Sequence, residues 1–235
     1  VQNKAVDLLC RNKHPDTVRH LVEVLKDESE YARRAAVEVL NVVGDDSSVR
    51  YLLQAIKDSD WWVRSRAADA LGKIGGPQVI GAALTLVSDR DEEVRRTAVE
   101  ILSQTKDERA VSHLVEATRD PDWWVSERAV DALGAIGSRT AVPRLLEMMQ
   151  ANPKSVPTIV RALGKIGDHT ATDSVMRALD RPETDIRIEA MAALVRLAED
   201  RTVDPVRARI APLLSAMEQT VAGAAQRSLA ELEAR

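Results

Sequence analysis

The chain has 235 residues, of which 45% are hydrophobic and 30% are charged, and its formal net charge is −4. This composition is that of a soluble globular protein, and there is no run of about 18 apolar residues that could span a membrane. The acidic balance argues against a nucleic-acid binder, because phosphate contacts require a basic face.

The apolar residues limit the possible fold classes, and the single cysteine limits the possible cellular compartments. Phe is absent, which favours close packing of helix against helix over a β-sandwich. Cys10 alone cannot form an internal disulfide framework and fits a reducing compartment, so we expect a cytoplasmic protein. The chain begins at Val1 with an apolar face, and we expect it to have been excised from a longer protein.

One phrase recurs along the chain. It reads VRSRAADALGKIG at 63–75 and VSERAVDALGAIG at 125–137, with weaker copies before, between and after. Its leucine recurs at spacings of 31, 31, 31, 30, 31 and 35 residues, as Leu40, Leu71, Leu102, Leu133, Leu163, Leu194 and Leu229. A repeat of this length over nearly the whole chain indicates stacked helical units whose apolar faces cover one another.

The predicted units follow one another in a single repeat domain over 1–235. A half unit at 1–12 is followed by full units at 13–44, 45–75, 76–106, 107–137, 138–167, 168–199 and 200–235. Each full unit is expected to hold two helices. In the unit 45–75, Val63, Ala67 and Leu71 fall on one face of the second helix, which Gly75 ends. In the unit 138–167, Pro157 predicts a later start of the second helix.

The segment Asp58–Gly75 reads D-x-D-x-x-V-R-x-x-A-x-x-A-L-G-x-I-G. This pattern resembles the short, armadillo-like HEAT repeats first associated with phycobilisome lyases, and the resemblance covers essentially the whole chain. It implies an all-α fold, an α-solenoid of about seven two-helix HEAT-like repeats (an alpha-alpha superhelix), whose second helices line a concave surface.

The resemblance also implies a ladder of ion pairs between the aspartate of each turn and the arginine that follows the valine. The aspartates of this series are Asp27, Asp58, Asp89, Asp120 and Asp180, and the arginines are Arg33, Arg64, Arg95 and Arg187. Ser126 replaces the arginine in one unit. We interpret these charges as structural.

All four tryptophans occur as two pairs, two repeats apart, at the starts of second helices. Exposed Trp, often with Arg, is a preferred hot spot of protein interfaces. Beneath the pairs runs a column of acids, Glu38, Asp69, Glu100 and Asp131, which is expected to offer a place for cations. The candidate partner-binding residues are therefore Tyr31, Trp61, Trp62, Arg66, Asp69, Glu93, Glu100, Trp123, Trp124, Arg128 and Asp131. The alternative is that a Trp of each pair only covers the ridge between repeats, stacked on Arg66 or Arg128.

No catalytic motif is present. The chain lacks a Gly-rich phosphate loop and the C-x-x-C, H-E-x-x-H and G-x-S-x-G patterns. Its histidines, His14, His20, His113 and His169, lack metal-ligand spacing, and the His-Glu pairs of deoxyhypusine hydroxylase are absent. We therefore predict no catalytic residue, no metal and no cofactor.

The sequence predicts a non-catalytic protein–protein interaction scaffold that binds a partner segment, with basic or aromatic anchors, in its concave groove. Two alternatives remain from the resemblance. One is a phycobilin-lyase-like subunit, and the other is a HEAT-like protein that acts on nucleic acid, where Trp62 with Asp69 would resemble the Trp and Asp of alkylpurine DNA glycosylases. A third alternative is a structural spacer without a ligand.

Overall fold

The computed structural model describes residues 2–11, 15–199 and 201–234, and every regular element in these ranges is a helix. His14 lies outside the described residues. Within the described ranges, no helix is long and apolar enough to cross a membrane. The chain divides into two compact units, the N-terminal unit Val1–Arg128 and the C-terminal unit Ala129–Arg235.

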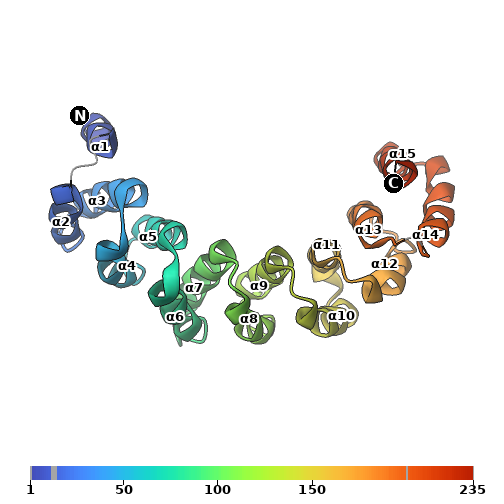
Figure 1. The fold of residues 1–235 in the computed structure, drawn as a ribbon, viewed down its shortest axis with the longest axis horizontal. Helices are drawn as coiled ribbons and strands as arrows, with labels where there is room; N and C mark the ends of the chain where they lie inside the picture. Colours follow the sequence, from blue (N-terminus) through green and yellow to red (C-terminus); the bar gives the residue numbers. More distant parts are fainter. Residues whose placement is uncertain (1, 12–14, 200, 235) are drawn as a thin grey trace. The chain divides into compact units, whose positions relative to one another are not determined.

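The N-terminal unit is built from two rows of helices (Figure 1). One row contains α1 (Gln2–Arg11), α3 (Glu30–Val43), α5 (Trp61–Ile74) and α7 (Glu92–Thr105), and the other contains α2 (Pro15–Val24), α4 (Val49–Ala55), α6 (Gly76–Leu86) and α8 (Val111–Ala117). Short 3-10 turns, η1 (Asp46–Ser48) and η2 (Glu108–Ala110), precede α4 and α8. Helix α9 (Trp123–Ile136) begins in this unit and ends in the next.

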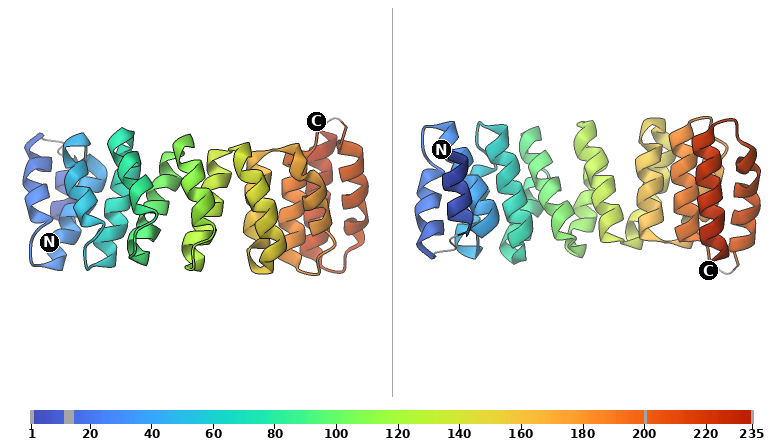
Figure 2. Two further views of the ribbon diagram at one scale, coloured as in Figure 1. Left: turned by 90° about the horizontal axis from the view of Figure 1, so that it is seen from below. Right: turned by 90° about the horizontal axis from the view of Figure 1, so that it is seen from above.

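The C-terminal unit repeats this plan. Its helices are α10 (Val142–Ala151), α11 (Val156–Ile166), α12 (Thr172–Ala178), α13 (Thr184–Leu197), α14 (Val203–Ile210) and α15 (Gln219–Glu233). Its 3-10 turns are η3 (Arg139–Ala141), η4 (Pro153–Ser155), η5 (His169–Ala171) and η6 (Ala211–Ser215). In Figure 2 the helices of each unit lie side by side, as in an α-solenoid.

The recurring leucines form the core of both units. Leu40, Leu71 and Leu102 in the N-terminal unit, and Leu133, Leu163 and Leu194 in the C-terminal unit, are almost completely buried. Burial of such a side chain stabilises the fold by about 1.5–3 kcal/mol. The last leucine of the series, Leu229, is only partly buried.

The second helices begin and end where the sequence predicts. The Asp60 carboxylate accepts the backbone N–H groups of Trp62 and Val63 and so caps the start of α5. Gly75 ends the helix with a φ of 64°, a value that favours glycine. Helix α11 begins only at Val156, because Pro153–Ser155 form the turn η4 instead of a first helical turn.

Candidate functional site

An outer ladder of ion pairs joins neighbouring repeats of the N-terminal unit. Arg33 donates to both carboxylate oxygens of Asp58, at 2.8 Å from Nε and 3.1 Å from Nη2. Arg95 binds Asp120 in the same way, at 2.7 Å and 3.0 Å. The Nη1 atom of each arginine also donates to the backbone carbonyl that starts its own turn, at 2.8 Å and 3.0 Å. The predicted ladder is therefore present at these two junctions.

The junction between them departs from the prediction. Arg64 keeps its bond to the turn carbonyl of Asp58, at 2.9 Å, but its Nη2 atom donates to Glu93 at 3.0 Å and not to Asp89. Among the described residues, the cation within ion-pair distance of the Asp89 carboxylate is the Lys57 ammonium, at 3.8 Å. An Arg64–Asp89 pair, which would be equivalent to Arg33–Asp58 and Arg95–Asp120, is therefore not formed, and the longer Glu93 side chain reaches the guanidinium from the first turn of α7.

The C-terminal unit also pairs its ladder residues with other partners. Arg187 binds Glu218 at 2.7 Å, and Asp180 binds Arg209 at 2.7 Å. The ladder residues of this unit are thus paired, but with different residues from those that the repeat pattern predicts.

A second, inner ladder of ion pairs, which the repeat pattern did not predict, runs beside the outer one. Arg34 binds Asp60 at 3.0 Å from Nε and 2.5 Å from Nη2, and Arg96 binds Asp122 at 2.5 Å from Nε. Hydrogen bonds from these arginines lower the pKa of Asp60 and of Asp122. The backbone N–H groups that the two aspartates cap lower it further. The Arg-Arg pairs at 33–34 and 95–96 were the sequence signal for it.

The two tryptophans of each pair have different environments. The Arg66 guanidinium lies 4.6 Å from the ring centre of Trp62, and Arg128 lies 5.3 Å from that of Trp124. Trp61 and Trp123 are 62% and 70% exposed. The Trp61 ring meets Trp62 edge to face at 5.6 Å, with an interplanar angle of 87°. Stacking on arginine, the alternative raised from the sequence, thus applies to the second Trp of each pair.

A pocket of about 470 Å³ opens between α5, α7 and the first turns of α9. Six of the predicted residues line it, namely Trp61, Asp69, Glu93, Glu100, Trp124 and Arg128. Arg64, Ser65, Ala68, Arg96 and Thr97 complete the lining and were not predicted. Tyr31, Trp62, Arg66 and Trp123 are not among the lining residues, and Asp131 belongs to the C-terminal unit.

The predicted acidic column is not an open place for cations. Glu38 is 3.1 Å from Arg66, Glu100 is 3.5 Å from Arg128, and Asp131 is 3.1 Å from Arg161. Asp69 binds Arg66 at 3.0 Å and accepts a hydrogen bond from Gln104 at 3.1 Å. The expectation was wrong because each arginine lies within reach of an acid on an adjacent second helix.

Comparison with family models identifies the repeats. The model of HEAT repeats matches residues 1–56, 18–85 and 80–158, which together exceed half of the chain. The chain belongs to the HEAT-repeat family. HEAT repeats are typical of protein-interaction scaffolds. A search of curated protein sequences found no matching relative.

Solved structures share the fold at low sequence identity. An engineered protein is 19% identical with a TM-score of 0.55, over 92% of this chain and 68% of its own. The CpcE–CpcF complex of phycocyanin lyase from Nostoc is also 19% identical, with a TM-score of 0.54, over 92% of this chain and 94% of its own. Human deoxyhypusine hydroxylase is 21% identical over 99% and 90%, with a TM-score of only 0.46. At this identity the first two likenesses show the fold alone.

Proposed function

We propose that this HEAT-repeat chain is a non-catalytic scaffold that binds a segment of a partner protein along the starts of the second helices of its N-terminal unit. The observation that carries the proposal is the exposure of Trp61 and Trp123, two repeats apart in the same register. Large exposed aromatic side chains are the usual anchors of protein interfaces, and Trp61 also lines the pocket.

The other aromatic rings differ from those of Trp61 and Trp123, because each of them has a cation of the chain nearby. Arg34 lies 5.9 Å from the Tyr31 ring centre, and Lys26 and Arg50 lie over Tyr51, in addition to the arginines over Trp62 and Trp124. Among the described residues, no cation of the chain covers Trp61 or Trp123. These two indole faces are therefore available to a partner, which would bury apolar area and contact the ring electrostatically.

The charges near the pocket favour a protein partner over nucleic acid. Its three arginines are held by carboxylates of the chain: Arg64 by Glu93, Arg96 by Asp122 and Glu93, and Arg128 by Glu100. Asp91 and Glu92, at the start of α7, are both exposed. A phosphate backbone would meet repulsion here, whereas a peptide segment would not.

The test is capture of partners from an extract of the source cells by the Trp61→Ala/Trp123→Ala variant and by wild type. We expect the double variant to lose the captured partner, because both uncovered rings are gone, and to keep the helical circular dichroism of wild type. A matched control is Leu214→Ala/Met217→Ala, which removes exposed apolar side chains from the C-terminal unit and is expected to capture normally.

Unchanged capture by the folded Trp double variant would overturn the proposal. The alternatives give their own signals. A lyase-like subunit would acquire bilin absorbance when mixed with free bilin, and a nucleic-acid protein would bind DNA at physiological ionic strength with a steep salt dependence. We expect neither.

A further inference from the structure

The inner ladder has one gap in the N-terminal unit. Position 34 and position 96 are arginines, and each binds the aspartate 26 residues later. The equivalent position in α5 is Ser65, whose side chain is too short to reach across the repeat. Its would-be partner, Asp91, is nevertheless present. At the middle one of these three equivalent positions, an aspartate is therefore present without the arginine that its equivalents bind.

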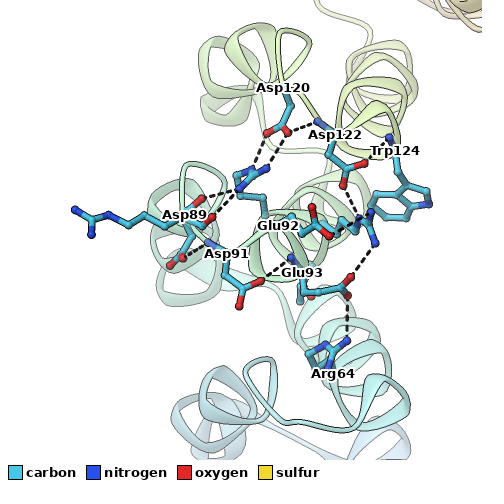
Figure 3. A network of polar contacts seen from close by, with 12 residues as sticks. Arg64, Asp89, Asp91, Glu92, Glu93, Asp120, Asp122 and Trp124 are labelled. Carbon is cyan, nitrogen blue, oxygen red and sulfur yellow. Dashed lines mark hydrogen bonds and ion pairs between the residues drawn. The ribbon is translucent and has the colours of Figure 1, made fainter.

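Asp91 is more exposed than Asp60 and Asp122, because no arginine in the described part of the chain covers it. The side chains of Asp60 and Asp122 are only 7% and 5% exposed beneath their arginines, whereas Asp91 is exposed. Asp91 accepts the backbone N–H of Glu93 at 2.9 Å, which caps α7 (Figure 3). Among the described residues, no cationic side chain lies within ion-pair distance of Asp91.

The groups around the gap suit a guanidinium. In the next repeat, Arg96 binds Asp122 at 2.5 Å and Glu93 at 2.8 Å, with Glu92 at 3.9 Å, and Trp124 lies in the first turn of the helix that Asp122 caps. By the same register, a guanidinium at the gap would bind Asp91. The uncovered Trp61 ring has the position there that Glu92 has in the next repeat, and Glu93 has the position of Trp124. Trp61, Ser65 and Glu93 line the 470 Å³ pocket, while Asp91 and Glu93 line a neighbouring pocket of about 450 Å³.

We propose that this gap is the binding site for an arginine side chain of the partner, which completes the inner ladder in place of the residue that Ser65 lacks. The proposal rests on the proposed function, since it names the chemistry of the partner segment held there. The Asp91 carboxylate can accept the doubly donating guanidinium as Asp60 accepts that of Arg34, and the Trp61 face adds a cation–π contact. A lysine ammonium would satisfy only part of this geometry.

Two arginines hold Glu93, Arg96 at 2.8 Å through Oε1 and Arg64 at 3.0 Å through Oε2. Arg64 can release its oxygen of Glu93 when the partner arginine binds. It makes one hydrogen bond to Glu93, whereas its equivalents Arg33 and Arg95 make two to the aspartate 25 residues later. That aspartate, Asp89, is in place, with its carboxylate accepting the Asp91 N–H at 3.0 Å as its equivalents do in the other turns. A shift of Arg64 from Glu93 to Asp89 would complete the outer ladder as the partner completes the inner one.

The experiment selects binders from a random peptide library displayed on phage, with wild type, Ser65→Arg, Ser65→Ala and Trp61→Ala as baits. We expect wild type and Ser65→Ala to enrich peptides with an arginine at one aligned position. Ser65→Arg fills the gap from within, so it should bind those peptides at least tenfold more weakly, as expected for the loss of charged hydrogen bonds. It should also raise Tm by about 2–4 °C.

A selected peptide then tests the charge itself. Replacing its arginine with citrulline, which has the same shape without the charge, should weaken binding to wild type about tenfold. Asp91→Asn keeps the cap of α7 and should weaken binding of the arginine peptide, whereas Glu92→Gln removes one charge from the next residue and should have little effect. Equal binding of the arginine and citrulline peptides would overturn the proposal, as would equal binding to wild type and Ser65→Arg.

The two proposals fail in different ways. Trp61-dependent peptides without a shared arginine would overturn the arginine site and leave the scaffold function standing. Peptides that bind Trp61→Ala as well as wild type, or a wild type that enriches none, would count against the scaffold surface itself.

Discussion

Arg95 and Asp120 join consecutive repeats through two parallel hydrogen bonds of 2.7 Å and 3.0 Å. Their side chains are only 13% and 7% exposed, so the pair is largely withdrawn from water. Loss of one partner leaves the other charge buried without compensation, which costs more than the pair itself contributes.

We therefore expect Arg95→Met, which keeps the aliphatic stem, to lower the free energy of unfolding by about 2–3 kcal/mol in urea. The matched control is Arg119→Met, because Arg119 pairs with Glu116 at 2.6 Å on the surface, where the side chains are 49% and 72% exposed. That change should cost about 0.5 kcal/mol or less. Equal effects of the two substitutions would show that the ladder has no special role in stability.

The inner ladder predicts a loss of stability in acid. The arginine hydrogen bonds hold the pKa of Asp60 and Asp122 below the ordinary value in the folded chain. The unfolded chain binds protons more readily at these sites, so their contribution is complete above about pH 4 and is lost as the pH falls through the lowered folded pKa values.

The check is the urea midpoint from pH 6 down to pH 2.5 for wild type and for Arg34→Gln/Arg96→Gln. The double variant should be less stable at pH 6, and the difference should shrink as the solution is acidified. A difference that stays constant across this range would contradict the assignment of the lowered pKa values to these two arginines.

Close helix packing in the C-terminal unit predicts opposite outcomes for two glycines. A Cβ added at Gly164 would lie 2.8 Å from both Cα and Cβ of Ala193, across the contact of α11 with α13. Gly164→Ala should therefore destabilise the chain by about 1–3 kcal/mol, in spite of the better helix propensity of alanine. Gly81 in α6 has no atom within 4 Å of such a Cβ, so Gly81→Ala should stabilise by about 0.5–1 kcal/mol. Thermal unfolding of the two variants decides the matter, and a stabilised Gly164→Ala would contradict the close approach.

The unequal tryptophans predict unequal quenching by iodide. Trp61→Phe/Trp123→Phe should leave a fluorescence that iodide quenches much less than that of wild type, because Arg66 and Arg128 cover the remaining rings. Trp62→Phe/Trp124→Phe should leave the readily quenched pair. Similar accessible fractions in the two variants would mean that the pairs are not divided into a covered and an uncovered ring.

The repeat register let the sequence predict much of the fold. The spacing of Leu40, Leu71 and Leu102 located the second helices, Gly75 their ends, and Pro157 the late start of α11. The stacking of Arg66 on Trp62 follows from i+4 spacing within one helix, so it also was accessible from sequence.

Contacts between repeats were harder to predict. The register gives the neighbours of a residue but not the reach of their side chains, which decides whether Arg64 binds Asp89 or Glu93. Their length also lets Arg66 and Arg128 form ion pairs with Glu38 and Glu100, so these acids are not open to added cations. The inner ladder and its gap at Ser65 became visible only when Arg34 and Arg96 were seen to hold the caps of the following helices.

Photo-crosslinking to the partner recovered by wild type shows whether the starts of the second helices bind it. Benzoylphenylalanine is placed in position 92, where Glu92 is exposed at the start of α7, or in position 81, where Gly81 is exposed on α6. We predict a crosslink to the partner from position 92, lost on Trp61→Ala/Trp123→Ala, and none from position 81. A crosslink from position 81 with none from position 92 would mean that the partner binds a different surface of the chain.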